Sequence, residues 1–173
     1  MSRITRTRSG GFSLLELAAV LAVVSILAAV VFLRLDALTE RGATVRADEL
    51  RRNLAHVQQL ALGWGVSLRL TVVAANSYSV TCRTASPNCG AGAVGDTAVD
   101  PATGDPFTVT LTDSVTLGPV GNTVDFDSLG RPREPTTGIL SASNPARTYT
   151  LTGGSRTATV TLLPITGFAA TSY

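Results

Sequence analysis

Residue types suited to catalysis are scarce in this sequence and poorly spaced. The only histidine, His56, falls in a helical segment, where a lone histidine is more often a surface or packing residue than a general base. Motifs typical of serine hydrolases, zinc proteases and nucleotide phosphate binding are absent. Asp125 with Asp127, and Asp100 with Asp105, could in principle ligate Ca²⁺, but they fit turn and cap positions better. We therefore expect no enzymatic activity, no cofactor and no metal.

The two cysteines, Cys82 and Cys89, are close enough in sequence to form a disulfide. Pro87 and Gly90 favour a short loop that can bring the two Cα atoms within 4.4–6.8 Å. In an oxidising compartment we expect the pair to be bonded, whereas two free buried thiols would fit a reducing one.

A pair of arginines, Arg131 and Arg133, flanks a proline after Gly130. In extended backbone both guanidinium groups lie on the same side, about 6.6 Å apart, which is close to the spacing of phosphates along one nucleic acid strand. An ordinary turn between strands is the alternative, since Asp127 and Glu134 weaken the positive potential here. Two further arginines could extend the patch if the fold brings them near: Arg147 and Arg156.

The elements that must position these residues begin with a long apolar segment. Residues 12–33 contain one charge, Glu16, and as a helix would be about 33 Å long, near the thickness of a bilayer core. An ordinary secretory signal is disfavoured, because the apolar run is longer than the usual 7–15 residues and no cleavage site closes it. Three arginines precede the segment and three follow it, so charge alone does not orient it.

The sequence around the start of this segment carries a family resemblance. The residues Gly10-Gly11-Phe12-Ser13-Leu14-Leu15-Glu16 resemble the signal of type IV prepilins and type II secretion pseudopilins. The resemblance implies that a prepilin peptidase cuts between Gly11 and Phe12 and that Phe12 is then N-methylated. A generic single-span anchor with a chance Gly-Phe pair is the alternative.

The resemblance also makes Glu16 the fifth residue of the mature chain. A carboxylate in the bilayer costs about 2.5–3.5 kcal/mol on insertion scales. Glu16 is one helical turn from Phe12 and could neutralise an α-amino group exposed by cleavage, its own or a neighbour's. It could also extend to the headgroups.

The rest of the chain predicts an α+β fold. Leu50, Leu54, Val57 and Ala61 form an apolar stripe of helical period, and Gly63-Trp64-Gly65 should end the helix. We expect a leader at 1–11, a membrane helix at 12–33, its amphipathic continuation at 34–62 and a β-rich domain at 63–173. Thr- and Val-rich runs predict strands at 66–73, 78–83, 107–112, 115–117, 123–126, 147–152 and 157–163.

This arrangement is most similar to the minor pilin subgroup that contains FimT and GspH. The resemblance implies a minor subunit of a type IV pilus or a type II secretion pseudopilus, anchored in the bacterial inner membrane with its C-terminal domain in the periplasm. Its partners would be the peptidase and other pilin subunits. FimT-like subunits implicated in DNA uptake carry a Gly-Arg-x-Arg motif that residues 130–133 match, so DNA binding at Arg131 and Arg133 is the alternative function.

Overall fold

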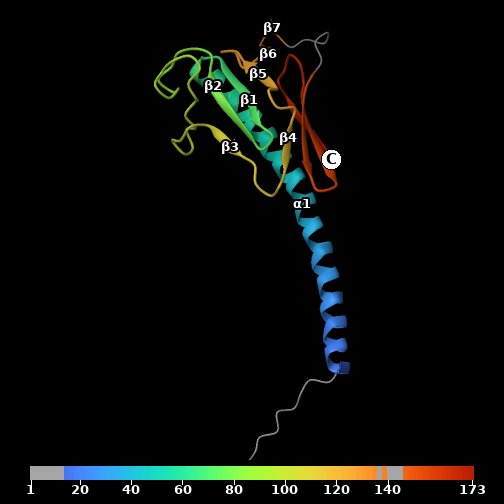
Figure 1. Cartoon of the computed structure of the whole chain (residues 1–173). Helices are drawn as coiled ribbons and strands as arrows, with labels where there is room; N and C mark the ends of the chain where they lie inside the picture. Colours follow the sequence, from blue (N-terminus) through green and yellow to red (C-terminus); the bar gives the residue numbers. More distant parts are fainter. Residues whose placement is uncertain (1–13, 136–137, 140–145) are drawn as a thin grey trace, which may run out of the picture. The chain divides into compact units, whose positions relative to one another are not determined.

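The computed structural model describes residues 14–135, 138–139 and 146–173; the side chains of 31–41 and 138–139 lie outside this description. One helix and ten strands make up the described chain, and the fold is α+β. The helix α1 covers Leu14–Trp64 (Figure 1). The strands are β1 Leu68–Ala74, β2 Ser77–Cys82, β3 Thr108–Thr110, β4 Thr116–Gly118, β5 Thr123–Phe126, β6 Pro132–Glu134, β7 Gly138–Ile139, β8 Arg147–Gly153, β9 Arg156–Leu162 and β10 Ala169–Ser172.

The chain divides into two compact units, Met1–Ala37 and Leu38–Tyr173. The second unit therefore begins within α1, whereas the sequence predicts a domain starting at residue 63. The second half of the helix belongs to this unit because its apolar stripe is part of the unit's core.

In the first unit, every described side chain from Leu14 to Val30 is exposed. Leu14 and Leu15 are the most exposed of these apolar side chains, at 88% and 83%. Among the described residues, no helix offers a stretch that is both long and apolar enough to cross a membrane. The ends of the expected span at 12–33 fall outside the described residues and side chains.

In the second unit, α1 contributes one face to the core. Leu50, Leu54, Val57 and Ala61 are fully buried, as the helical period predicts. The helix ends where the backbone of Gly65 turns left-handed (φ 66°), and the Val66 N–H donates to the Ala61 carbonyl at 3.2 Å. This hydrogen bond is typical of a glycine-terminated helix.

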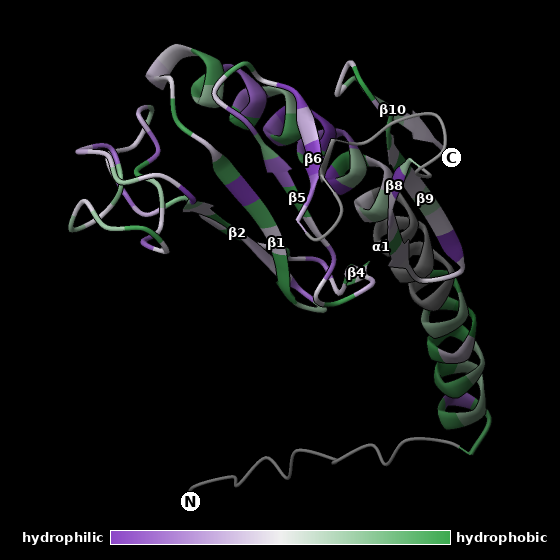
Figure 2. Ribbon diagram, turned by 90° about the horizontal axis from the view of Figure 1, so that it is seen from above, coloured by the Kyte–Doolittle hydropathy of each residue, from purple (hydrophilic) through white to green (hydrophobic). Residues whose placement is uncertain are grey.

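The strands form two antiparallel sheets rather than one. The first has the order β3-β2-β1-β5-β6-β7 and the second has the order β10-β9-β8-β4. Alternate residues of β1 point into the core, so Leu68, Leu70 and Val72 are buried while Arg69 and Thr71 face outward. Figure 2 shows this alternation as hydrophobic and hydrophilic bands along β1. Buried residues of both sheets and of α1 join in a single hydrophobic cluster.

Candidate functional site

The expected peptidase site, and the carboxylate expected at the fifth position of the mature chain, are described only in part. Gly11 and Phe12 lie outside the described residues. Glu16 lies in the first turn of α1 and borders a shallow groove whose other lining residues are Ala19, Val20, Val23 and Val24. The carboxylate therefore lies on an exposed apolar helix surface, which is a costly place for a charge once that surface is removed from water.

The two candidate DNA-contacting arginines share one carboxylate. The Asp127 Oδ2 atom accepts hydrogen bonds from Arg131 Nε at 2.9 Å and from Arg133 Nε at 3.0 Å. Both guanidinium groups thus lie on the same side of the chain, as extended backbone predicts. The arginine side chains keep 45% and 40% of their surface exposed, while that of Asp127 keeps 9%.

Asp127 also organises the turn that presents the arginines. Its Oδ1 atom accepts the backbone N–H groups of Leu129 at 3.0 Å and Arg131 at 2.9 Å. Burial by itself would raise the pKa of the Asp127 carboxyl, but the hydrogen bonds from Arg131, Arg133 and Leu129 together hold that pKa below its ordinary value. The carboxylate is therefore ionised at neutral pH and cancels one of the two positive charges beside it.

Two arginines that the sequence analysis did not assign to this patch lie next to it. The strand register aligns Arg69 of β1 with Asp125 of β5, and Asp125 with Arg133 of β6. Arg69 Nε donates to Asp125 Oδ1 at 2.6 Å, and Arg83 Nε lies 3.8 Å from Asp125 Oδ2. The outer face of the first sheet thus gathers four arginines and two aspartates. In the sequence, Arg69 and Asp125 occupy outward-facing positions of alternating strands. That pattern would have brought them together only if the pairing of β1 with β5 had been known.

The expected extension of the patch through Arg147 and Arg156 is not possible for both residues. They lie at opposite ends of the β8–β9 hairpin, because Arg147 pairs with Leu162 and Arg156 with Gly153. Arg147 forms an ion pair with Glu134, which follows Arg133 in β6. Only Arg147 is therefore near the patch.

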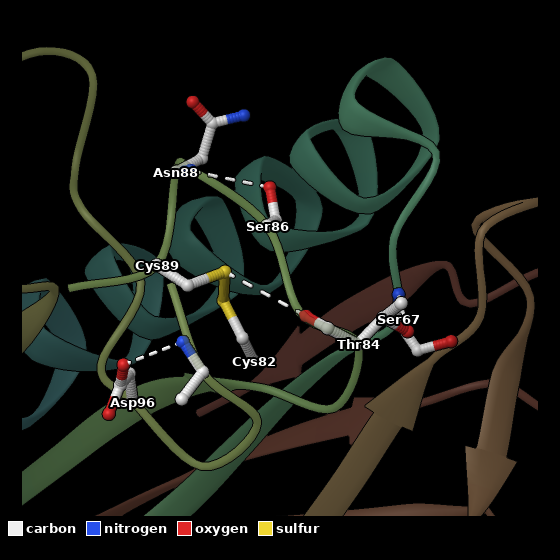
Figure 3. The surroundings of a disulfide bond; sticks show 8 residues. Ser67, Cys82, Thr84, Ser86, Asn88, Cys89 and Asp96 are labelled. Carbon is white, nitrogen blue, oxygen red and sulfur yellow. Dashed lines mark hydrogen bonds between the residues drawn. A yellow bond between two sulfur atoms is a disulfide. The ribbon is translucent and has the colours of Figure 1, made fainter. Parts of the chain in front are cut away.

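The two cysteines form a disulfide at the end of β2, with their Cα atoms 6.0 Å apart (Figure 3). Cys82 and Cys89 are fully buried. The Cys82 N–H donates to the Asp96 carbonyl, and the Gly95 N–H donates to the Cys82 carbonyl. The disulfide and these hydrogen bonds together attach the long loop at 83–107 to the sheet.

The remaining candidate ligands lie beside the same loop. His56 Nε2 is 3.9 Å from Asp100 Oδ1, and the His56 ring lies 5.9 Å from that of Phe107. A cleft between α1 and this loop is lined in part by Glu49, Asp100 and Asp105. Within the described ranges no three histidine, cysteine or acidic side chains are grouped so as to hold a metal ion. Asp125 and Asp127, considered above as calcium ligands, bind arginines instead.

Comparisons with known proteins agree with the signal and with the fold. Residues 6–32 match the family model of the prokaryotic N-terminal methylation motif. No curated protein gives a significant match to the chain. Among solved structures, the minor pseudopilin EpsH from the type 2 secretion system of Vibrio cholerae matches with a TM-score of 0.51 at 13% identity. The match covers 75% of this chain and 95% of EpsH.

At this identity the match shows the fold, and the motif shows the signal. The matched segment includes Gly11, Phe12 and Glu16. This chain therefore carries the methylation motif together with a fold similar to that of a minor pseudopilin.

Proposed function

We propose that this chain is a minor subunit of a type IV pilus or type II secretion pseudopilus, anchored by its N-terminal helix in the inner membrane. A prepilin peptidase cuts after Gly11, Phe12 is methylated, and the unit that starts at Leu38 lies in the periplasm. Its role is structural rather than catalytic.

The exposed apolar surface of α1 between Leu14 and Val30 carries this proposal. These side chains lie within the segment that matches the methylation motif, and they have no core of their own to pack against within their unit. Lipid before assembly, and the matching helices of other subunits afterwards, would remove this surface from water at a gain of about 25 cal/mol per Å². Glu16 would then pair with an α-amino group created by cleavage, so that its charge is compensated inside the bundle.

The experiment is to replace Glu16 and follow both insertion and assembly. Glu16→Val should leave membrane insertion intact or improve it, because a charge in the apolar segment is removed. It should strongly reduce recovery of the protein in sheared filaments. Ser25→Ala is the matched control: this hydroxyl bonds the Leu21 carbonyl of its own helix, and its loss should leave recovery normal. Normal recovery of Glu16→Val would show that the carboxylate has no role in docking.

DNA binding during uptake is the second candidate, and the four arginines on the outer face of the first sheet favour it. Arg69, Arg83, Arg131 and Arg133 outnumber Asp125 and Asp127 by two charges, and Arg131 and Arg133 remain accessible. Phosphate oxygens could accept from the guanidinium N–H groups that the aspartates leave unused.

Electrophoretic mobility shifts with a chain starting at Leu38 test this candidate. Arg131→Ala/Arg133→Ala should abolish the shift, while Arg156→Ala, at the far end of the β8–β9 hairpin, should not change it. Two phosphate contacts imply a slope of about −1.8 for log K against log salt. Absence of any shift at micromolar protein and low salt would remove the DNA function and leave the filament function in place.

A further inference from the structure

A patch of exposed apolar side chains lies at the end of the second unit where α1 stops. We call it the helix-end patch; its side chains are between 42% and 61% exposed and are those of Leu62, Leu129, Leu163, Ile165 and Phe168. They come from three separate segments: the last turn of α1, the turn between β5 and β6, and the loop between β9 and β10. Single exposed apolar residues are common, but a convergence from three segments indicates a contact surface.

One glutamine of the helix holds the three segments together. Gln58 Nε2 donates to the Gly130 carbonyl at 2.8 Å and to the Thr166 carbonyl at 2.8 Å. A Cβ on Gly167 would lie 2.8 Å from the same nitrogen, and one on Gly130 would lie 3.7 Å from the Leu62 Cβ. The patch residues neighbour these contacts in sequence, so they lie on fixed turns and can present a defined surface.

The conformation of Ile165 marks the same place. This β-branched residue has a φ of 72° and is 61% exposed. A β-branched side chain in the left-handed region costs stability, and such strain is concentrated at functional positions. If the Ile165 side chain were buried, packing in the core could compensate for the strained backbone. The side chain faces solvent, so the core gives no such compensation.

The charge beside the patch indicates what covers it. Arg131 follows Leu129 and Gly130 directly, and its side chain is 45% exposed. Arg131 and Arg133 share the single carboxylate of Asp127, so one net positive charge remains at the edge of the patch. Two copies joined patch to patch would both bring this charge to the same interface, which disfavours that pairing. An apolar centre with arginine at its edge is typical of protein interfaces, whereas nucleic acid surfaces offer little for aliphatic side chains.

We propose that the helix-end patch binds the globular part of a different filament subunit, whose contacting surface is apolar and edged by carboxylates. The proposal rests on the filament function proposed above, and adds to the N-terminal helix a second contact that selects the neighbouring subunit by shape and charge.

Photo-crosslinking of the full chain in its native cells tests this surface. With p-benzoylphenylalanine at Phe168, we expect an adduct with one other filament subunit, joined at a segment that combines apolar and acidic residues. The same reagent at Val120 is the control: Val120 is 58% exposed but precedes β5, whereas Leu129 follows it. The reagent at Ile26, in the N-terminal helix, reports filament assembly separately.

Second substitutions then test the chemistry. Leu129→Asp should lower the Phe168 adduct at least about tenfold, since it removes an anchor and adds a charge of the wrong sign. Leu129→Lys should lower it less. Ile165→Gly should lower the adduct while raising the melting temperature, because glycine relieves the strained backbone. A lower adduct yield together with a higher melting temperature would show that the substitution weakens binding and not folding.

Several results would overturn the proposal. These are an adduct of twice the chain's mass, an adduct with nucleic acid, equal yields from Phe168 and Val120, or equal effects of Leu129→Asp and Leu129→Lys. If Ile26 forms adducts and Phe168 forms none, the patch has no partner although the filament forms. If neither position forms adducts, the filament function itself is contradicted.

Discussion

Replacement of the buried Asp127 should destabilise the second unit more than replacement of an exposed carboxylate such as Asp48. Its Oδ1 atom satisfies two backbone N–H groups and its Oδ2 atom binds two guanidinium groups. The two backbone hydrogen bonds contribute about 1 kcal/mol each. The two ion pairs contribute about 0.5 kcal/mol each, because the arginines are well exposed and water screens them. Asp127→Ala should therefore cost about 3 kcal/mol, or about 10 °C in melting temperature.

Asp127→Asn separates the two contributions. Its amide oxygen can still accept the Leu129 and Arg131 N–H groups, but its NH₂ group faces guanidinium donors. We expect a loss of about 1 kcal/mol, dominated by the screened ion pairs. Asp48→Asn is the matched control, because Asp48 and Arg51 form an exposed pair at 3.6 Å, and its effect should stay below about 0.5 kcal/mol.

The pH dependence of the unfolding free energy is a second test of the contribution of Asp127. Because the folded-state pKa of Asp127 is lowered, its contribution is fully present above the ordinary value of 3.8 and is lost as pH falls further. The gap in unfolding free energy between wild type and Asp127→Asn should therefore be constant from pH 7 to about 5 and shrink below pH 3.8. Thermal unfolding of the full chain in mild detergent measures it. An Asp127→Ala variant as stable as wild type, or a gap unchanged at low pH, would refute the reasoning.

Two further stability predictions follow from the geometry. Gly42→Ala should fail to gain the usual helix stabilisation of about 1 kcal/mol, because the new Cβ would lie 3.1 Å from Val115 Cγ2; Gly63→Ala, with open space around it, should gain part of that amount. Calorimetry of both variants checks this, and a gain at Gly42 equal to that at Gly63 contradicts it. Replacing Cys82 and Cys89 together by serine should cost about 2 kcal/mol, and alkylation of the native protein without reductant should label neither cysteine. Two labelled cysteines would contradict the bridge.

Periodicity was sufficient to predict the helix and the long strands. The buried stripe of α1 repeats at helical spacing, and β1, β2, β8 and β9 alternate inward apolar with outward polar residues. Such patterns can be read because burial on one face dictates residue type at fixed intervals. In a sequence, Gly42 only lowers helix propensity, whereas the structure shows that it allows Val115 and Asp113 to approach the helix closely.

Three short strands could not be predicted by the same means. β6 has three residues and begins at a proline, which in a sequence indicates a turn. It is a strand because Phe126 pairs with the buried Pro132 and Asp125 with Arg133, and these partners depend on the turn that Asp127 organises. β7 and β10 are also short and depend on their neighbours for pairing.

The candidate site was predicted in its residues but not in its pairing. Arg131 and Arg133 were identified from their spacing, and Asp127 was noted as a nearby negative charge. The sequence did not show that one carboxylate binds both arginines, or that Arg69 lies beside them through its contact with Asp125. These contacts depend on strand register, which a single sequence does not specify.

The mass of the mature N-terminus tests the central claim most directly. Protein isolated from its native membranes should begin at Phe12 with a methyl group on its α-amino nitrogen, and should lack residues 1–11. Gly11→Val should block this maturation and leave the full-length chain. A native protein that begins at Met1, or one cut after the apolar run near Ala28-Ala29, would contradict the assignment of this chain as a processed pilin-like subunit.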